Sequence, residues 1–159
     1  MTLNMRALGI LLISALAIVS CNKDKVATKP SIKITSINGN VIPFGAGLVV
    51  EMDFTDKEGD ISNTMFVQKI RKNIRTTATI RDTFSLAIPT FPAKSTGEIQ
   101  LNMDYNNYLV SAINPPKKGT PPNEVFEDDT LEIRFALRDL AGNVSDTVSA
   151  GTIIVLRNN

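Results

Sequence analysis

Hydrophobic and polar residues alternate with a period of two over much of the chain that follows Pro30. The clearest case is the segment 131–138, LEIRFALR, where four large apolar residues are separated by glutamate, arginine and alanine. The segments 48–55 and 98–105 repeat the pattern with valine, methionine and phenylalanine against acids and amides. Such alternation is typical of a β-strand with one face buried. The pattern therefore predicts three half-buried strands.

Weaker alternation predicts further strands at 31–37, 65–72, 76–80, 84–88 and 147–156. Glycine, proline and asparagine separate these runs at short intervals, as at Asn38-Gly39-Asn40 and Gly142-Asn143. Seven or eight short strands with such turns predict an all-β fold, an Ig-like antiparallel β-sandwich. A helical period is absent except over one or two turns at 107–113.

The segment 106–129 interrupts the strand pattern and carries four prolines. It is predicted to be a long irregular crossover between strands. Loops of this length are uncommon in compact domains, and they are either functional or mobile. Both alternatives stay open at this point.

The chain opens with a different pattern. One cation, Arg6, precedes an apolar run at 7–19 that contains no acid and is too short to span a bilayer comfortably. This predicts a signal peptide. The residues Ile18, Val19, Ser20 and Cys21 resemble the lipobox of bacterial lipoproteins, which has a branched apolar residue and a small residue before an invariant cysteine.

The resemblance implies that a signal peptide, 1–20, is cleaved and that Cys21 is acylated with palmitate-type chains. Several chains anchor a protein stably, because each buried methylene contributes about 0.8 kcal/mol. Residues 21–30 are then the lipidated cysteine and a linker, and 31–159 the domain. Asn22 in place of aspartate favours the outer membrane, with the domain periplasmic or surface-exposed. The alternative is an ordinary secretory signal followed by a cysteine.

Composition narrows the function. Arg6 is the only charged residue among the first twenty, so the remainder carries 16 basic and 16 acidic residues and gives no reason to expect a nucleic-acid partner. A single cysteine excludes an internal disulfide. The chain has no histidine, which excludes serine triads and histidine-ligated zinc. The basic run Arg71, Lys72, Arg75 and Arg81 is expected to be a solvated strand face, and Tyr105 and Tyr108 are expected to pack at the sheet edge.

Two short motifs carry a second resemblance. The segment Ile133–Asp146 resembles the last two strands of bacterial immunoglobulin-like and fibronectin-type modules, in which an Asp, a Gly and an Asn form the tight turn. The segment Asp53–Asp60 is similar to the acidic turn of Ig-like, PKD-like and cadherin-like repeats. The tryptophan and paired cysteines of antibody domains are absent from the sequence, so the resemblance implies the sandwich architecture only.

The acidic turn is a candidate calcium site. Ca²⁺ prefers six to eight oxygen ligands at about 2.3–2.6 Å. In the Ig topology the loop after the second strand lies at the same end as the final hairpin turn. The expected ligands are therefore Asp56, Glu58, Asp60, Asp139 and Asn143. The alternative is that these residues only form turns, in which Asp and Asn bind their own backbone.

These observations predict a non-enzymatic, lipid-anchored binding or adhesion module of the cell envelope, with an envelope protein or a surface polysaccharide as its partner. The alternatives are a structural spacer without a ligand and a carboxylate-based hydrolase. A binding module should expose an apolar patch of several hundred Å², on the order of the patches that mark interaction sites. The short linker would hold the acidic turn toward the membrane, so that the crossover 106–129 faces outward and contacts the partner.

Overall fold

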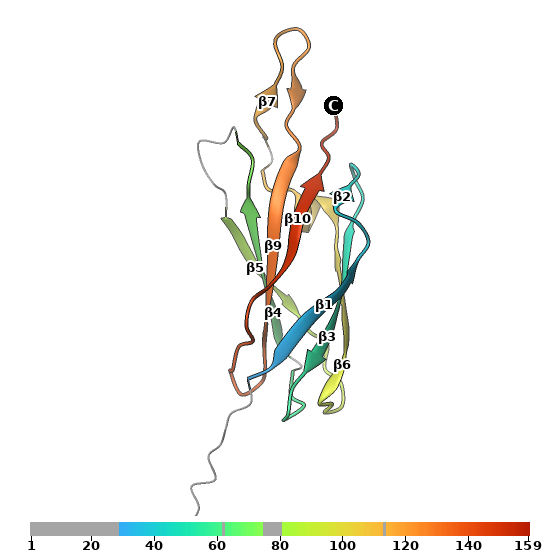
Figure 1. Ribbon diagram of the computed structural model, residues 1–159, viewed down its shortest axis with the longest axis vertical. Coiled ribbons are helices and arrows are strands. Elements are labelled where there is room, and N and C mark those ends of the chain that lie inside the picture. Colours follow the sequence, from blue (N-terminus) through green and yellow to red (C-terminus); the bar gives the residue numbers. More distant parts are fainter. Residues whose placement is uncertain (1–28, 62, 75–80, 113) are drawn as a thin grey trace, which may run out of the picture.

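A computed structural model shows two β-sheets packed face to face (Figure 1). It describes residues 29–61, 63–74, 81–112 and 114–159. The predicted signal peptide, Cys21, the linker up to residue 28 and the strand predicted at 76–80 lie outside the described residues. Among the described residues, no helix has the length and apolar character needed to cross a membrane.

The smaller sheet has three antiparallel strands in the order β1-β3-β6, which are Ser31–Ile37, Leu48–Thr55 and Thr96–Met103. The larger sheet has the order β2-β10-β9-β4-β5, which are Val41–Ile42, Val148–Val155, Asp129–Arg138, Thr64–Arg71 and Arg81–Ala87. Only the β2–β10 pair is parallel among these ladders. The first, second and fifth long strands form one sheet and the third, sixth and seventh the core of the other, as in the Ig fold.

The predicted Ig-like β-sandwich is therefore confirmed. Seven long strands lie within the predicted number, and the described residues add three strands of two residues each. The strands begin and end within a few residues of the predicted bounds. The strand predicted at 84–88 is β5, which begins at Arg81, and the strand predicted at 98–105 is β6, which ends at Met103.

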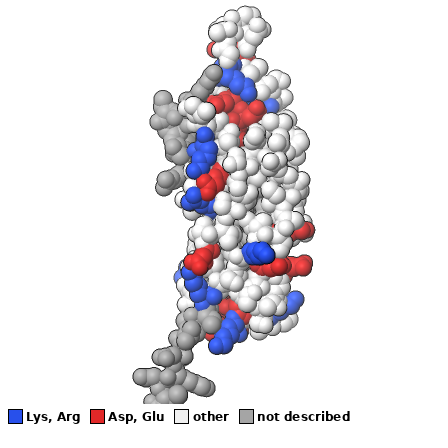
Figure 2. All heavy atoms as spheres, in the orientation of Figure 1, with Lys and Arg blue, Asp and Glu red and all other residues white. Residues whose placement is uncertain are grey.

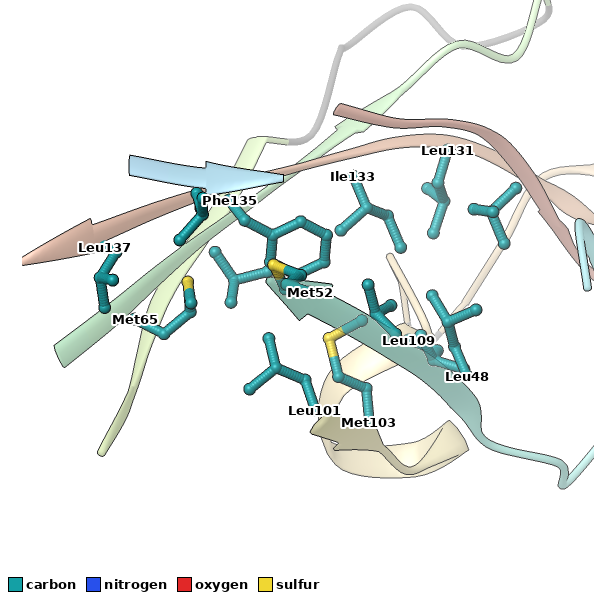
Figure 3. Packing of buried hydrophobic residues seen from close by; sticks show 14 of the residues in the cluster. Leu48, Met52, Met65, Leu101, Met103, Leu109, Leu131, Ile133, Phe135 and Leu137 are labelled. Carbon is teal, nitrogen blue, oxygen red and sulfur yellow. The ribbon is translucent and has the colours of Figure 1, made fainter. Parts of the chain in front are cut away.

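The core confirms the alternation that predicted the strands. In β9 every second side chain is fully buried, and Figure 3 shows Ile133, Phe135 and Leu137 packed toward Met52 and Met103 of the opposite sheet. Burying a side chain of this size contributes about 1.5–3 kcal/mol. A continuous apolar layer between the sheets thus holds the domain together without a disulfide.

A single helical turn follows β6. Asp104 ends the strand because its carboxylate accepts a hydrogen bond from the Asn107 N–H at 2.9 Å, and a π-helical turn, η1, runs over Tyr105–Leu109. The hydroxyl of Tyr105 donates to the Leu156 carbonyl at 2.8 Å. Tyr108 packs on Phe84, with 5.4 Å between ring centroids. The expected packing role of both tyrosines is confirmed, and the helical turn lies slightly before the predicted one.

The crossover is not irregular throughout, as the sequence had suggested. β7, Lys117–Lys118, pairs with β8, Val125–Phe126, in a small antiparallel hairpin. This hairpin, residues 117–126, is called the finger. Figure 1 shows it projecting beyond the two sheets, at the end of the molecule where the C-terminus lies. Two-residue strands have no periodicity, which explains why the sequence pattern could not indicate them.

The basic run was expected to lie on a solvated strand face, and this prediction is wrong for Arg71. Its side chain is 1% exposed, and Nε lies 3.0 Å from Oδ1 of Asp129. Lys72 is exposed and pairs with Glu132 at 2.9 Å, while Arg75 and the side chain of Arg81 lie outside the described residues. The alternation of β4 fails at its end, where residues 69–71 are all buried. Lys69 and Arg71 share the inner face of β4 with Met65 and Val67, and the crossover covers that face here, since Lys69 donates to the Val110 carbonyl at 3.0 Å.

The two ends of the sandwich differ. The acidic pole carries the loop 56–63 after β3 and the turn 139–147 after β9, and the finger pole carries the finger and the C-terminus (Figure 1). The chain enters at the acidic pole, because Ser31 pairs with Thr55 and Lys29 forms an ion pair with Asp146. The predicted placement of both loops at the end where the first strand begins is therefore confirmed.

Candidate functional site

The loop after β3 is clamped against the β5–β6 connection. The Asp56 N–H donates to the Ser95 carbonyl at 2.7 Å, and the Lys94 N–H donates to the Gly59 carbonyl at 3.1 Å. Gly59 has a φ of +73°, and a Cβ built there would lie 2.9 Å from the Lys94 nitrogen. Only glycine fits this conformation and this contact without strain. The loop is thus fixed by its backbone, so its side chains have defined positions.

Within this loop, one oxygen of Asp56 has a fixed partner. Its Oδ2 accepts a hydrogen bond from the Asp60 N–H at 2.9 Å. This bond closes the loop on itself and is a common way for aspartate to stabilise a turn. The remaining oxygen, Oδ1, is buried and has no hydrogen-bond partner, and the same is true of Oδ1 of Asp60.

The turn after β9 is built around Asp139. Its Oδ1 accepts from the Asn143 N–H at 2.7 Å, and its Oδ2 accepts from the Asn143 side-chain amide at 2.8 Å. The Leu140 N–H donates to the Asp60 carbonyl at 2.9 Å, and the Asn63 amide donates to the Asp139 carbonyl at 2.9 Å. These bonds join the turn after β9, in the larger sheet, to the loop after β3, in the smaller sheet.

The result is a group of three carboxylates. One oxygen from each of Asp56, Asp60 and Asp139 lies within 4.8 Å of the other two. The side chains of Asp56 and Asp139 are both 1% exposed, whereas Asp60 is half-buried. This group is called the carboxylate cluster.

The cluster concentrates negative charge. Burial raises the pKa of Asp60, the adjacent Asp56 carboxyl raises it further, and the negative charges of Asp139 and Asp56 act in the same direction. Within the described part of the chain, no Lys or Arg forms an ion pair with any of the three. Carboxylates this close cannot all be ionised without compensation. The cluster therefore calls for either a shared proton or a bound cation.

Of the five ligands predicted from the sequence, the structure brings three together. Glu58 is exposed and lies outside the carboxylate cluster. Asn143 contacts Asp139 through its amide nitrogen and so orients that carboxylate. The supporting contacts of Asn63 and Lys94 were not predicted, because residues in separate loops give no spacing signal in a sequence.

A second feature lies at the finger pole. A cleft of about 300 Å³ opens between the finger, the turn before β3 and the C-terminal residues, and its lining is Phe44, Tyr105, Asn106, Val110, Pro115, Phe126, Arg157 and Asn158. Phe44 is 56% exposed and meets Tyr105 edge to face at 5.2 Å between centroids. Val125 and Phe126 on the finger are exposed as well. This feature is called the finger cleft, and the sequence analysis did not single out Phe44.

No protein family and no curated protein matches this chain. Among solved structures, it is similar to a β-glucosidase from Listeria innocua in complex with gluconolactone, at 13% identity and a TM-score of 0.41, over 80% of this chain and 16% of that one. It is also similar to the sporulation control protein Spo0M from Bacillus subtilis, at 12% identity and a TM-score of 0.41, over 82% of this chain and 50% of that one.

A putative late embryogenesis abundant protein is similar at 11% identity and a TM-score of 0.41, over 94% of this chain and 83% of that one. The chain thus spans about a sixth of the glucosidase and half of Spo0M. These likenesses are too weak to identify a family or to assign an activity.

Proposed function

We propose that this protein is a lipid-anchored, non-enzymatic Ig-like binding module of the cell envelope, which contacts another envelope macromolecule through its finger pole. The observation that carries the proposal is the finger cleft. It brings two exposed aromatic rings, Phe44 and Phe126, to the lining of one cleft, which supports a binding module more than a spacer. A protein partner or a surface polysaccharide would each use such a cleft.

The chemistry of the cleft suits macromolecular recognition. Aromatic residues and arginine are enriched where binding energy concentrates in interfaces. Phe44 and Phe126 supply apolar rings, and Arg157 adds a cation that is already held rigid by Asp129 and by the Ala112 carbonyl at 2.7 Å. A rigid lining loses little conformational entropy when a partner binds.

The position of the cleft fits a tethered protein. The nine residues from Asn22 to Pro30 span at most about 30 Å when extended. A lipid on Cys21 would then keep the acidic pole near the membrane and present the finger pole outward. This orientation is what a module that reaches for a partner requires.

Enzymatic activity is not part of the proposal. The chain has no histidine, and two of the three clustered carboxylates are almost fully buried. A carboxylate hydrolase needs two acids that flank the scissile bond of an accessible substrate. A polymer could not reach Asp56 and Asp139 in this arrangement.

Site-specific photocrosslinking in the native host tests the proposal. A photoreactive residue at Phe126 should form a covalent adduct with an envelope component, and one at Val144 should not. The two side chains are a matched pair, each 39% exposed, at opposite poles. Sensitivity of the adduct to protease or to glycosidases distinguishes a protein from a polysaccharide. Equal crosslinking at both positions, or none at position 126, would contradict the proposal.

Removing the ring of Phe126 should weaken binding of the partner and leave the stability of the fold almost unchanged. We expect Phe126→Ala to change the free energy of unfolding by less than about 1 kcal/mol, because the side chain is exposed. The same change should weaken binding of the partner captured at the finger pole. A variant that binds as well as the wild type would place the contact elsewhere.

The anchor has a separate test. Cys21→Ser should move the protein from the membrane fraction to the soluble fraction. The wild-type N-terminal peptide should carry the mass of acyl chains on residue 21. An unmodified cysteine would leave an ordinary secreted domain.

A further inference from the structure

We propose that the carboxylate cluster of Asp56, Asp60 and Asp139 binds one hard divalent cation, calcium by the number of carboxylates, and that this cation ties the two sheets together at the acidic pole. This site lies at the opposite end from the finger cleft, and it holds whether or not the module binds a partner there.

Two buried acceptors in the carboxylate cluster have no donor. Oδ1 of Asp56 is buried within a side chain that is 1% exposed, and Oδ1 of Asp60 is buried beside it; neither accepts a hydrogen bond. Buried polar atoms in folded proteins are almost always paired, because an unpaired one costs about 1–3 kcal/mol and a charged one more. An oxygen-loving cation is the partner that would satisfy both at once.

Hydrogen bonds hold the carboxylates of Asp56 and Asp139 in place before a cation binds. The Asp60 N–H fixes Asp56 through Oδ2, and the Asn143 amide groups fix Asp139 through both oxygens. A carboxylate oxygen that accepts one hydrogen bond still has a lone pair for a metal. Metal ligands in proteins are commonly oriented by such outer hydrogen bonds.

The spacing and the number of the carboxylates suit calcium. Two oxygens on opposite sides of a Ca²⁺ ion lie about 4.6–5.2 Å apart, twice the Ca–O distance. The clustered oxygens lie within 4.8 Å of one another, a span that a single ion can bridge. Mg²⁺ is usually held by one or two carboxylates and keeps several waters, so a site with three carboxylates favours Ca²⁺. Three carboxylates leave coordination positions for water on the side of half-buried Asp60.

The location gives the cation a structural role. Asp56 and Asp60 lie in the loop that follows β3 of the smaller sheet, and Asp139 lies in the turn that follows β9 of the larger one. A hydrogen bond from the Leu140 N–H to the Asp60 carbonyl already joins the two loops. A cation between them would add a second link where the chain enters the domain.

Thermal melts of the full-length, chelator-stripped protein in EDTA, CaCl₂ or MgCl₂ test the site. Calcium at about 100 times its dissociation constant should raise the melting temperature by at least about 5 °C, and magnesium should raise it less. Asp56→Asn should abolish the rise, because it removes a ligand charge and keeps an oxygen for the Asp60 N–H. The matched control Asp53→Asn, an exposed acid of the same strand, should keep it.

Two outcomes would overturn the proposal. Absence of a shift and of binding heat with millimolar calcium would mean that Asp56 and Asp60 share a proton instead. An equal shift in Asp56→Asn would place calcium elsewhere. If that variant fails to fold, Mn²⁺ on the wild type decides: it should broaden the amide NMR signals of Asp60 and Leu140, spare Val125, and be displaced by calcium. Broadening elsewhere, or none, would also overturn the site.

Discussion

Buried charge is handled in opposite ways at the two poles of this sandwich. At the finger pole Asp129, which is 0% exposed, lies between two guanidinium groups, with Arg71 at 3.0 Å and Arg157 on its other oxygen. At the acidic pole three carboxylates share one small volume without a basic partner among the described residues. The same fold thus contains one network in which buried charges of opposite sign are paired and one in which like charges lie together without a cation among the described residues.

The paired network at the finger pole holds the crossover in place. The Arg157 N–H donates to Asp128 at 2.7 Å, Lys118 pairs with Asp128 at 3.3 Å, and the Ser111 hydroxyl donates to Asp129 at 2.5 Å. These contacts fasten both ends of the crossover to the sheets. Figure 2 shows acidic and basic atoms side by side close to the finger. The network therefore fixes the finger, and with it the shape of the finger cleft.

Neutralising one acid at each pole should give the largest difference in the free energy of unfolding between the two poles. Asp129→Asn removes the anion that Arg71 and Arg157 share. It leaves Arg71 with only Glu127, at 3.9 Å, as an acidic partner in the described part of the chain, so we expect a loss of about 3–5 kcal/mol in the free energy of unfolding. Asp56→Asn, measured in EDTA, should cost nothing or stabilise, because it removes a charge that repels its neighbours. Urea unfolding at neutral pH measures both. Equal losses would contradict the contrast.

A smaller effect should follow from distorting the acidic loop through its backbone. Gly59→Ala places a Cβ 2.9 Å from the Lys94 nitrogen at a φ of +73°, and we expect a loss of about 2–3 kcal/mol. Gly142→Ala is the matched control, since its φ is +92° and its Cβ would meet only Arg138 Nη2, at 3.7 Å. It should cost about 1–2 kcal/mol. The calcium-induced rise in melting temperature should shrink with Gly59→Ala. A cost equal to the control's would show that Lys94 does not clamp the loop.

The smallest effect concerns a paired acid on β9 near the finger pole. Hydrogen bonds from Arg134 first, and from Lys72 second, lower the pKa of Glu132 from 4.5 to about 2. Because the folded-state pKa lies below the unfolded one, the stabilisation is complete above pH 4.5 and is lost as the pH falls through 2. The stability difference between wild type and Glu132→Gln should therefore narrow over that interval. An NMR titration of the Glu132 carboxyl that gives an ordinary pKa would contradict this.

The contrast also shows what a sequence can predict. Alternation predicted the long strands, because one face of each is buried against the other sheet, as in β3 and β9. The Ig topology then placed Asp139 near Asp56 and Asp60, so most of the acidic site followed from strand order. Both inferences needed only local pattern and a known arrangement.

The paired network and the finger could not be predicted in this way. Arg71, Asp129 and Arg157 are far apart in the chain. Arg71 and Asp129 continue the buried faces of β4 and β9 at a strand end, and Arg157 follows β10. A charged residue in such a position is usually solvated, so its burial depends on what the crossover covers. The exposure of Glu58 depends on the conformation of its loop, which the spacing of the acids in the sequence does not determine.

Diffraction from crystals soaked in MnCl₂ decides whether the carboxylate cluster holds a cation, because anomalous scattering locates the metal. We expect a peak between Asp56, Asp60 and Asp139, bound by one oxygen of each and weakened when CaCl₂ is added in excess. A cluster without a peak, in which Asp56 and Asp60 share a proton across a short oxygen–oxygen contact, would contradict this expectation.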